Sequence, residues 1–382
     1  MKKLQKFMSY LVVAVLSSAL TLAVNQPEAP GKLDTLESLI EEKFIGEVDT
    51  AAMENAAAAA MIASLGDRWS YYIPADQYSS YLEQMNNSYV GIGVTIQVLE
   101  DSSGFLVTKV NEGGPADQAG MLPGDKMVAV DGTDVRAMGV EETSALVKGE
   151  ENTTVDITVD RAGEQITLTV TRMLVETPVA VAKMLEGNIG LITIANFDKR
   201  CADETIAAMD TLLEQGANKL IFDVRFNPGG YVTELVDVLD HILPEGDLFR
   251  SMDYKGRESV DTSDADCIEG IPMAVLINGD SYSAAEFFAA ALSEYGYAII
   301  VGEPTTGKGY FQQTYQLGDG SAAGLSVGKY FTPNGVSLAE EGGLIPDVVI
   351  TVDEETAMGI YAGTLEPELD PQIQAAIEAL NK

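Results

Sequence analysis

A buried strand followed directly by a helix, in residues 271–295, constrains the fold of this chain more than any other segment. Residues 271–277 form a continuous apolar run typical of a buried strand, and the run ends at the turn sequence Asn278-Gly279-Asp280. Apolar residues then recur at helical spacing, at positions 287, 288, 291, 292 and 295. This pattern predicts that Ser283 stands at or just before a helix N-terminus.

Ser283 admits two interpretations. Backbone N–H groups at a helix N-terminus are unpaired and the helix dipole is positive there, so a hydroxyl could lose its proton to a base and have an oxyanion form beside it. A serine that only caps the helix explains the same position without any chemistry. The chemical interpretation therefore depends on whether the chain offers a base.

Lys308 is the best candidate for that base. The only histidine, His241, lies in an apolar-rich stretch typical of a helix end, where a structural role is expected. Lys308 is flanked by glycines and follows an apolar strand at residues 297–301, so burial would lower its pKa and leave a neutral amine. Gln312, four residues later, could hold that amine by a hydrogen bond. A solvated turn lysine is the alternative.

The two segments together resemble the carboxyl-terminal processing (tail-specific) proteases, a Ser/Lys peptidase family. Its nucleophile segment is roughly N-x-x-S-A-S-A-S-E and its lysine segment roughly T-[FY]-G-K-G-x-x-Q. The matching residues are Asn278, Ser281, Ser283, Ala284 and Glu286 in the first and Thr305, Gly307, Lys308, Gly309 and Gln312 in the second. The resemblance implies that Ser283 is the nucleophile, Lys308 the general base and Gln312 the residue that orients the lysine. Tyr282, Ala285 and Thr306 depart from the family residues, and Tyr282 is bulky beside the nucleophile.

Residues 88–172 are predicted to form a PDZ domain. Short β-rich runs occur there at 91–99, 104–110, 126–130 and 154–159, separated by glycine turns. We expect a loop of successive backbone N–H groups to bind a peptide carboxylate, and the strand beginning at Val94 to pair with the bound peptide. The residues of this loop are Val90, Gly91, Ile92 and Gly93.

Residues 173–352 are predicted to form an α/β core with a largely parallel sheet, because strand and helix signals alternate there. Active sites of such sheets gather beyond the carboxyl ends of the strands. The strand at 219–224 ends in Arg225-Phe226-Asn227-Pro228-Gly229-Gly230. The resemblance makes Gly229 or Gly230 an oxyanion donor together with the N–H of Ala284; a turn that needs positive φ is the alternative.

The resemblance covers about residues 33–352 and implies an α/β protease core of the ClpP/crotonase-like class, a mainly-β PDZ domain inserted in or preceding it, and an N-terminal helical segment. The expected organisation is a signal anchor at 1–24, a linker and helical region at 25–87, the PDZ domain at 88–172, the peptidase core at 173–352 and a surface tail helix at 353–382. The helical region is expected to break near Gly46 and to pack on the protease or on another subunit, which would make a homo-oligomer.

Lys2, Lys3 and Lys6 precede an uncharged stretch at 7–24, which is typical of a secretory signal or a signal anchor. The stretch is long enough to span a bilayer, and the lysines favour the inner side, so we expect a single-pass cell-membrane protein with its catalytic part outside the cytoplasm. Cys201 and Cys267 would then meet oxidising conditions, but nothing in the sequence brings them together.

The net charge of -36 argues against nucleic acid as a partner. No metal-ligand cluster, phosphate loop or nucleotide fingerprint is present in the sequence, so no cofactor is expected. The preferred function is a serine endopeptidase that cleaves proteins near their carboxyl termini, with the PDZ domain binding the substrate terminus. A catalytically silent PDZ scaffold that only captures peptide tails is the alternative.

Overall fold

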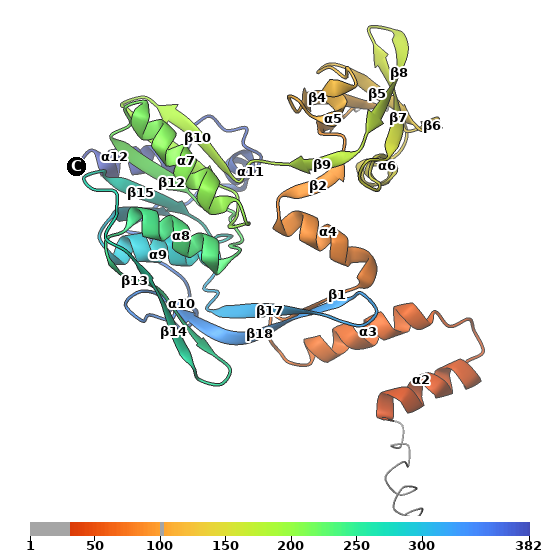
Figure 1. Cartoon of the computed structure of the whole chain (residues 1–382), viewed down its shortest axis with the longest axis horizontal. Coiled ribbons are helices and arrows are strands. Elements are labelled where there is room, and N and C mark those ends of the chain that lie inside the picture. Colours follow the sequence, from red (N-terminus) through yellow and green to blue (C-terminus); the bar gives the residue numbers. More distant parts are fainter. Residues whose placement is uncertain (1–30, 100–102) are drawn as a thin grey trace, which may run out of the picture. The chain divides into compact units, whose positions relative to one another are not determined.

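The computed structural model describes residues 31–99 and 103–382 (Figure 1). Among the described residues, 31–64 belong to one compact unit and those from Leu65 onward belong to another. The described part of the first unit contains helices α2 (Lys32–Lys43) and α3 (Thr50–Ala63). Asp49 caps α3 by accepting a hydrogen bond from the Ala52 N–H at 3.0 Å, and the alanine-rich sequence of α3 favours a helix.

The region predicted as a PDZ domain is a small antiparallel sheet with two short helices (Figure 1). The strand order is β3-β4-β5-β7-β8, with β6 paired to β5, and the interior contains apolar residues such as Phe105, Met127 and Ile157. The bounds are β3 (Val94–Val98), β4 (Phe105–Val110), α5 (Pro115–Gln118), β5 (Lys126–Val130), β6 (Thr133–Asp134), α6 (Val140–Val147), β7 (Thr154–Arg161) and β8 (Glu164–Thr171).

The α/β core contains a six-stranded sheet in the order β10-β11-β12-β15-β16-β19. Only the β10–β11 pair is antiparallel. The central strand β15 is buried at every position, which suits a strand covered on both faces. The bounds are β10 (Ala180–Leu185), β11 (Ile189–Ile194), α7 (Cys201–Glu214), β12 (Lys219–Asp223), α8 (Val232–Ile242), β15 (Met273–Ile277), α9 (Ala284–Glu294), β16 (Ala298–Gly302) and β19 (Val348–Val349).

A second, antiparallel sheet follows the order β1-β18-β13-β14, with β17 also paired to β18. It receives β1 from the segment before the PDZ region, and α4 follows β1 in sequence. The bounds are β1 (Tyr71–Ile73), α4 (Ala75–Met85), β13 (Gly246–Asp253), β14 (Glu258–Ser263), β17 (Tyr310–Gln316), β18 (Ala322–Phe331), α10 (Leu338–Glu341) and α11 (Glu354–Tyr361).

The two faces of the parallel sheet are covered by different helices. Alternate residues of β12 point to opposite faces: Leu220 and Phe222 belong to the core formed with α7, α8 and α9, and Ile221 belongs to the core on the other face. That second face is covered by α12 (Pro371–Leu380), which contributes Ile373, Ala376 and Leu380. The tail thus contains a helix with one face in the core, whereas Gln374 and Glu378 on its other face are exposed.

A buried ion-pair network joins α12 to the end of β12. Arg225 Nη2 lies 2.9 Å from Asp370 Oδ2, and its Nε donates to Asp223 Oδ1 at 2.8 Å. The Nη1 of Arg225 donates to Gln372 Oε1, also at 2.8 Å. Arg225 and Asp370 side chains are only 2% and 3% exposed, so each depends on the other for its charge balance.

Replacing Asp370 with alanine should lower the free energy of unfolding by about 3 to 5 kcal/mol, because it leaves the buried Arg225 with one carboxylate fewer. It also removes the N-cap of α12, since Asp370 Oδ1 accepts from the N–H groups of Gln372 and Ile373. Urea unfolding measures this change. Asp353→Ala is the matched control: Asp353 caps the exposed helix α11 and its loss should cost only about 1 kcal/mol. Equal effects of the two variants would contradict the role of the Arg225 network.

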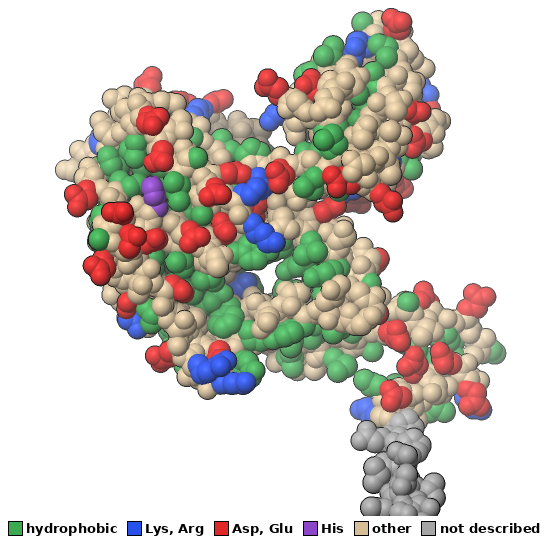
Figure 2. All heavy atoms as spheres, viewed as in Figure 1, with side chains coloured by type: hydrophobic (Ala, Val, Ile, Leu, Met, Phe, Trp, Pro, Cys, Tyr) green, Lys and Arg blue, Asp and Glu red, His purple; other side chains and the backbone are tan. Residues whose placement is uncertain are grey.

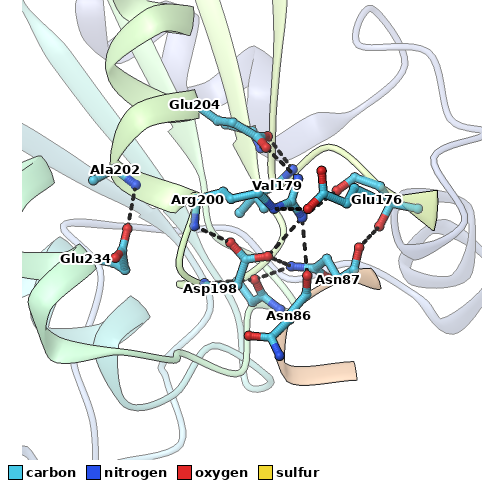
Figure 3. Close-up of polar contacts among 12 residues, drawn as sticks. Asn86, Asn87, Glu176, Val179, Asp198, Arg200, Ala202, Glu204 and Glu234 are labelled. Carbon is cyan, nitrogen blue, oxygen red and sulfur yellow. Dashed lines mark hydrogen bonds and ion pairs between the residues drawn. The ribbon is translucent and has the colours of Figure 1, made fainter. Parts of the chain in front are cut away.

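One polar network holds both chain segments that connect the PDZ region to the core (Figure 3). These segments contain β2 (Ser88–Gly91) and β9 (Met173–Glu176), which pair with each other. Arg200 donates hydrogen bonds to the backbone oxygens of Asn86 and Thr177, at 3.3 and 3.0 Å, and to Asp198 at 3.0 Å. Asn87 Nδ2 also donates to Asp198, at 2.9 Å. The residues just before β2 and just after β9 are thus tied to the segment that leads into α7.

Acidic side chains are spread over the face shown in Figure 2, in keeping with the net charge. No helix within residues 31–99 and 103–382 is long and apolar enough to cross a membrane. The anchor predicted at 1–24 lies outside the described residues. Cys201 is buried, Cys267 is partly exposed, and both are free thiols.

Candidate active site

Ser283 is the N-cap residue of α9, in the turn that follows β15. Its backbone has φ 58° and ψ -128°, a conformation that is uncommon and strained for a serine. The turn is fixed from both sides: Ser281 Oγ donates to the Val224 oxygen at 2.7 Å, and the Phe226 N–H donates to Asn278 Oδ1 at 2.9 Å. Ser283 is 7% exposed, so this strained turn presents its side chain from an almost buried position.

Glu286, one turn into α9, is fully buried and joins the Ser283 segment to the Lys308 segment. Its Oε2 accepts the N–H of Ser283 at 2.9 Å and the N–H of Lys308 at 2.8 Å. Its Oε1 accepts the Thr305 hydroxyl at 2.5 Å and the Gly307 N–H at 2.6 Å. The sequence showed Glu286 only as a matching residue; its position three residues after the N-cap was the signal for a capping role.

Lys308 lies in the loop before β17, and the residue is partly buried. Burial lowers the pKa of Lys308 to about 8, although the nearby carboxylates of Glu286 and Asp67 act in the opposite direction. The amine lies over two aromatic rings, with Nζ 4.9 Å from the centroid of Trp69 and 5.6 Å from that of Tyr282. A substantial fraction of Lys308 is therefore neutral at mildly alkaline pH.

The loop geometry explains the glycine before Lys308. Gly307 has φ 80°, and a Cβ there would lie 2.8 Å from the Gly343 backbone nitrogen. Any other residue would push the loop away from residue 343.

Among the described residues, the Gln312 side chain forms no hydrogen bond with Lys308. Its Nε2 donates to the Tyr310 oxygen at 3.1 Å and to Ser326 Oγ at 3.0 Å. Within the part of the chain that the structure describes, Ser283 Oγ and Lys308 Nζ also form no hydrogen bond with each other. The structure brings the two backbones together through Glu286, whereas the role of Gln312 in orienting the lysine stays a prediction.

The two candidate oxyanion glycines differ in what their N–H groups do. Gly229 lies against the nucleophile, since a Cβ at this position would be 2.7 Å from Ser283 Cβ, but its N–H donates to Asn227 Oδ1 at 2.8 Å. Among the described residues, the N–H groups of Gly230 and Ala284 have no acceptor. Gly230 and Ala284 are thus the donors still available to a substrate oxygen, and Gly229 permits the close approach of the loop.

The predicted carboxylate loop is shorter than expected. Val90 and Gly91 belong to β2 and pair with Leu174 and Met173 of β9. Ile92 and Gly93 follow β2, and their N–H groups have no acceptor among the described residues. Gly91, Ile92 and Gly93 line a cavity of about 830 Å³, whose other walls come from β3, α6 and α4.

His241 lies in the last turn of α8, with Nε2 3.9 Å from Asp210 Oδ1, and forms no hydrogen bond with Ser283 in the part of the chain that the structure describes. The described residues contain no group of three or more histidine, cysteine or acidic side chains that could hold a metal ion. The groups that the structure places at this site are a hydroxyl, an amine of lowered pKa and backbone N–H groups without an acceptor.

Comparison with known proteins gives the family. Residues 188–350 match the model of peptidase family S41, and residues 106–161 match that of the PDZ domain. The carboxy-terminal processing protease CtpA of Bacillus subtilis (strain 168) is 32% identical over 356 residues, which cover 89% of this chain and 76% of that protein. The chain belongs to peptidase family S41. It is a serine protease of the carboxyl-terminal processing group, and this membership favours the enzyme over a silent PDZ scaffold.

Other relatives agree with this assignment. The carboxyl-terminal-processing protease of Synechocystis sp. (strain ATCC 27184 / PCC 6803 / Kazusa) is 29% identical to this S41 peptidase, over 84% of the chain and 75% of the relative. A crystal structure of a protein assigned to the S41 proteases from Bacteroides fragilis has a TM-score of 0.55 at 16% identity, and the match covers 94% of this chain and 99% of that one. This structural likeness supports the fold.

Proposed function

We propose that this S41 peptidase hydrolyses polypeptides near their carboxyl termini, with Ser283 as the nucleophile and Lys308 as the general base. The contact that carries the proposal is Glu286, because one buried carboxylate oxygen accepts the N–H groups of both residues. The lowered pKa of Lys308 adds support, since a lysine must lose its proton before it can accept one from a serine.

The proposed reaction has two stages. Neutral Lys308 accepts the Ser283 proton while Oγ attacks the scissile carbonyl, and the N–H groups of Gly230 and Ala284 stabilise the oxyanion. The Lys308 ammonium then returns the proton to the leaving amine, and an acyl-enzyme forms. Water hydrolyses this ester with Lys308 again as the base. Before the first stage, the Lys308 amine must move away from the rings of Trp69 and Tyr282 and toward Ser283.

We propose that the PDZ domain binds the carboxyl terminus of the substrate. Ile92 and Gly93, whose N–H groups have no acceptor among the described residues, line the 830 Å³ cavity and directly precede the edge strand β3. An extended peptide could add to that edge with its carboxylate at these N–H groups. Three other features stay predictions from the sequence. They are the ClpP/crotonase-like class, the membrane anchor with an extracytoplasmic active site, and a homo-oligomer.

The full chain should cut an unstructured protein that ends in a free carboxylate, and the same protein with an amidated terminus should be cut clearly more slowly. The amide lacks the charge that the N–H groups of Ile92 and Gly93 would bind. Mass spectrometry of the fragments measures both rates and places the cuts. Ser283→Ala is the control and should give no fragments. Equal rates for acid and amide would contradict PDZ recognition of the carboxylate, and fragments from Ser283→Ala would contradict the nucleophile.

A further inference from the structure

Two aromatic rings from distant parts of the chain meet at the Lys308 amine. The ring centroids of Trp69 and Tyr282 are 5.9 Å apart, and Lys308 Nζ lies within 6 Å of both, at 4.9 and 5.6 Å. Both distances fit a cation–π interaction. Lys308 Nζ forms no ion pair or hydrogen bond with any residue that the structure describes, so the two rings are the direct contacts of its charged form.

Both rings are attached to fixed backbone. The Trp69 N–H donates to Asp67 Oδ1 at 3.1 Å, and the neighbouring Ser70 connects the same segment to β18, where it accepts the Ser326 N–H at 3.1 Å. Tyr282 directly precedes the nucleophile, and its N–H donates to the Asn227 oxygen at 3.1 Å. The rings therefore form a preformed site, and the Lys308 side chain, with its flexible stem, is the part that can move.

We propose that Trp69 and Tyr282 are positioning residues that hold the charged Lys308 side chain away from Ser283 and release it once the amine is neutral. The proposal rests on Lys308 being the general base. A ring face attracts an ammonium through its quadrupole and has no such attraction for a neutral amine. Loss of a proton to solvent thus has two effects: it makes Lys308 a base and it removes the interaction that keeps the side chain over the rings.

The burial of Lys308 and the charged groups around it determine the pH at which it loses its proton. Burial lowers the pKa of Lys308, and the carboxylates of Glu286 and Asp67 partly oppose that change. The guanidinium of Arg68 also lies over the Trp69 ring, 4.2 Å from its centroid. Burial, followed by Asp280, raises the pKa of Tyr282, so that its phenol stays neutral while Lys308 titrates.

Trp69 is the only tryptophan in the chain, so its fluorescence reports on this site alone. We expect the emission of the full chain carrying Ser283→Ala to change between about pH 6 and about pH 9.5, with a midpoint at about 8. Lys308→Met, which keeps a long apolar side chain without the charge, should abolish the change. Tyr282→Leu should move the midpoint down by about half to one pH unit, since the ammonium loses one ring while the site stays apolar.

Two further variants distinguish loss of the cation–π interaction from a nonspecific effect of the substitution on the structure. Tyr282→Phe keeps the ring and should restore the wild-type midpoint. Tyr254→Leu removes a matched ring, which lies 5.3 Å from Lys255 Nζ, and should not move the midpoint. With Ser283 present, the alkaline rise of kcat/KM should shift with Tyr282→Leu in the same direction and by the same amount as the fluorescence midpoint.

The outcomes distinguish this proposal from the Ser/Lys assignment. If the Trp69 emission does not change with pH, or if Lys308→Met or Tyr282→Leu leaves its pH dependence unchanged, the positioning role is wrong. This holds even if Lys308→Ala is inactive. If the Trp69 emission changes with pH as expected but Lys308→Ala keeps full turnover, Lys308 is not the general base. The cation–π interaction is then correct without a role in catalysis.

Discussion

Lys308→Ala is expected to lower kcat/KM on the order of 10^4-fold or more, as far as Ser283→Ala does, because a nucleophile and its base act as a unit. The double variant should be no slower than either single one. Wild-type activity should rise with pH through about 8, since the pKa of Lys308 is lowered to that value and only the neutral amine accepts a proton. Initial rates of cleavage of one peptide across pH measure all three effects.

Two control variants test whether the loss of activity is specific to Lys308. Lys255→Ala removes another lysine that lies over a tyrosine ring, far along the chain in the turn between β13 and β14, and should retain turnover. His241→Ala should also retain it, because His241 lies at the end of α8 beside Asp210. A histidine base would produce a rise near about pH 6.5. Robust activity in Lys308→Ala, or loss of activity in a well-folded His241→Ala, would show that the base is assigned wrongly.

The sequence predicted the position of Ser283 in the fold better than the contacts around it. Ser283 and Lys308 stand in short motifs whose residue types limit what they can do, and a helix does begin directly after Ser283. The link between them was not predictable from spacing, because the Glu286 carboxylate accepts hydrogen bonds from Gly307 and Lys308, which come 21 and 22 residues later in the chain. The expected contact of Gln312 assumed regular alternation after Lys308. The β17–β18 register instead shifts between Phe311 and Gln312.

Contacts between residues far apart in the chain were also not predictable from the sequence. Charged and polar residues are mostly exposed in proteins, yet Arg225, Asp370 and Gln372 meet inside this one and bring α12 onto the sheet. Hydrogen-bond direction is equally invisible in a motif. Gly229 and Gly230 are adjacent glycines, and only the structure shows that the first donates its N–H to Asn227 while the second does not.

Glu286→Gln should reduce both activity and stability, although it changes only one oxygen to an NH2 group. Each carboxylate oxygen accepts two donors, so the amide nitrogen must face either the Ser283 and Lys308 N–H groups or the donors from Thr305 and Gly307. Two buried donors without an acceptor cost about 2 to 6 kcal/mol in total. Since about 1.36 kcal/mol is tenfold in rate, kcat/KM should fall on the order of 10^2 to 10^4 if the loops separate.

The pH profile of the remaining activity gives a second, independent result. The Glu286 carboxylate raises the pKa of Lys308, so its removal lowers that pKa and residual activity should reach its plateau at a lower pH than in the wild type. Glu294→Gln is the matched control: Glu294 lies at the other end of α9 and accepts from the Thr332 hydroxyl and the Asn334 N–H. It should lose stability without losing turnover. An unchanged melting temperature and kcat/KM in Glu286→Gln would mean that Glu286 does not hold Ser283 and Lys308 together, because two orphaned donors in a fully buried site cannot be without cost.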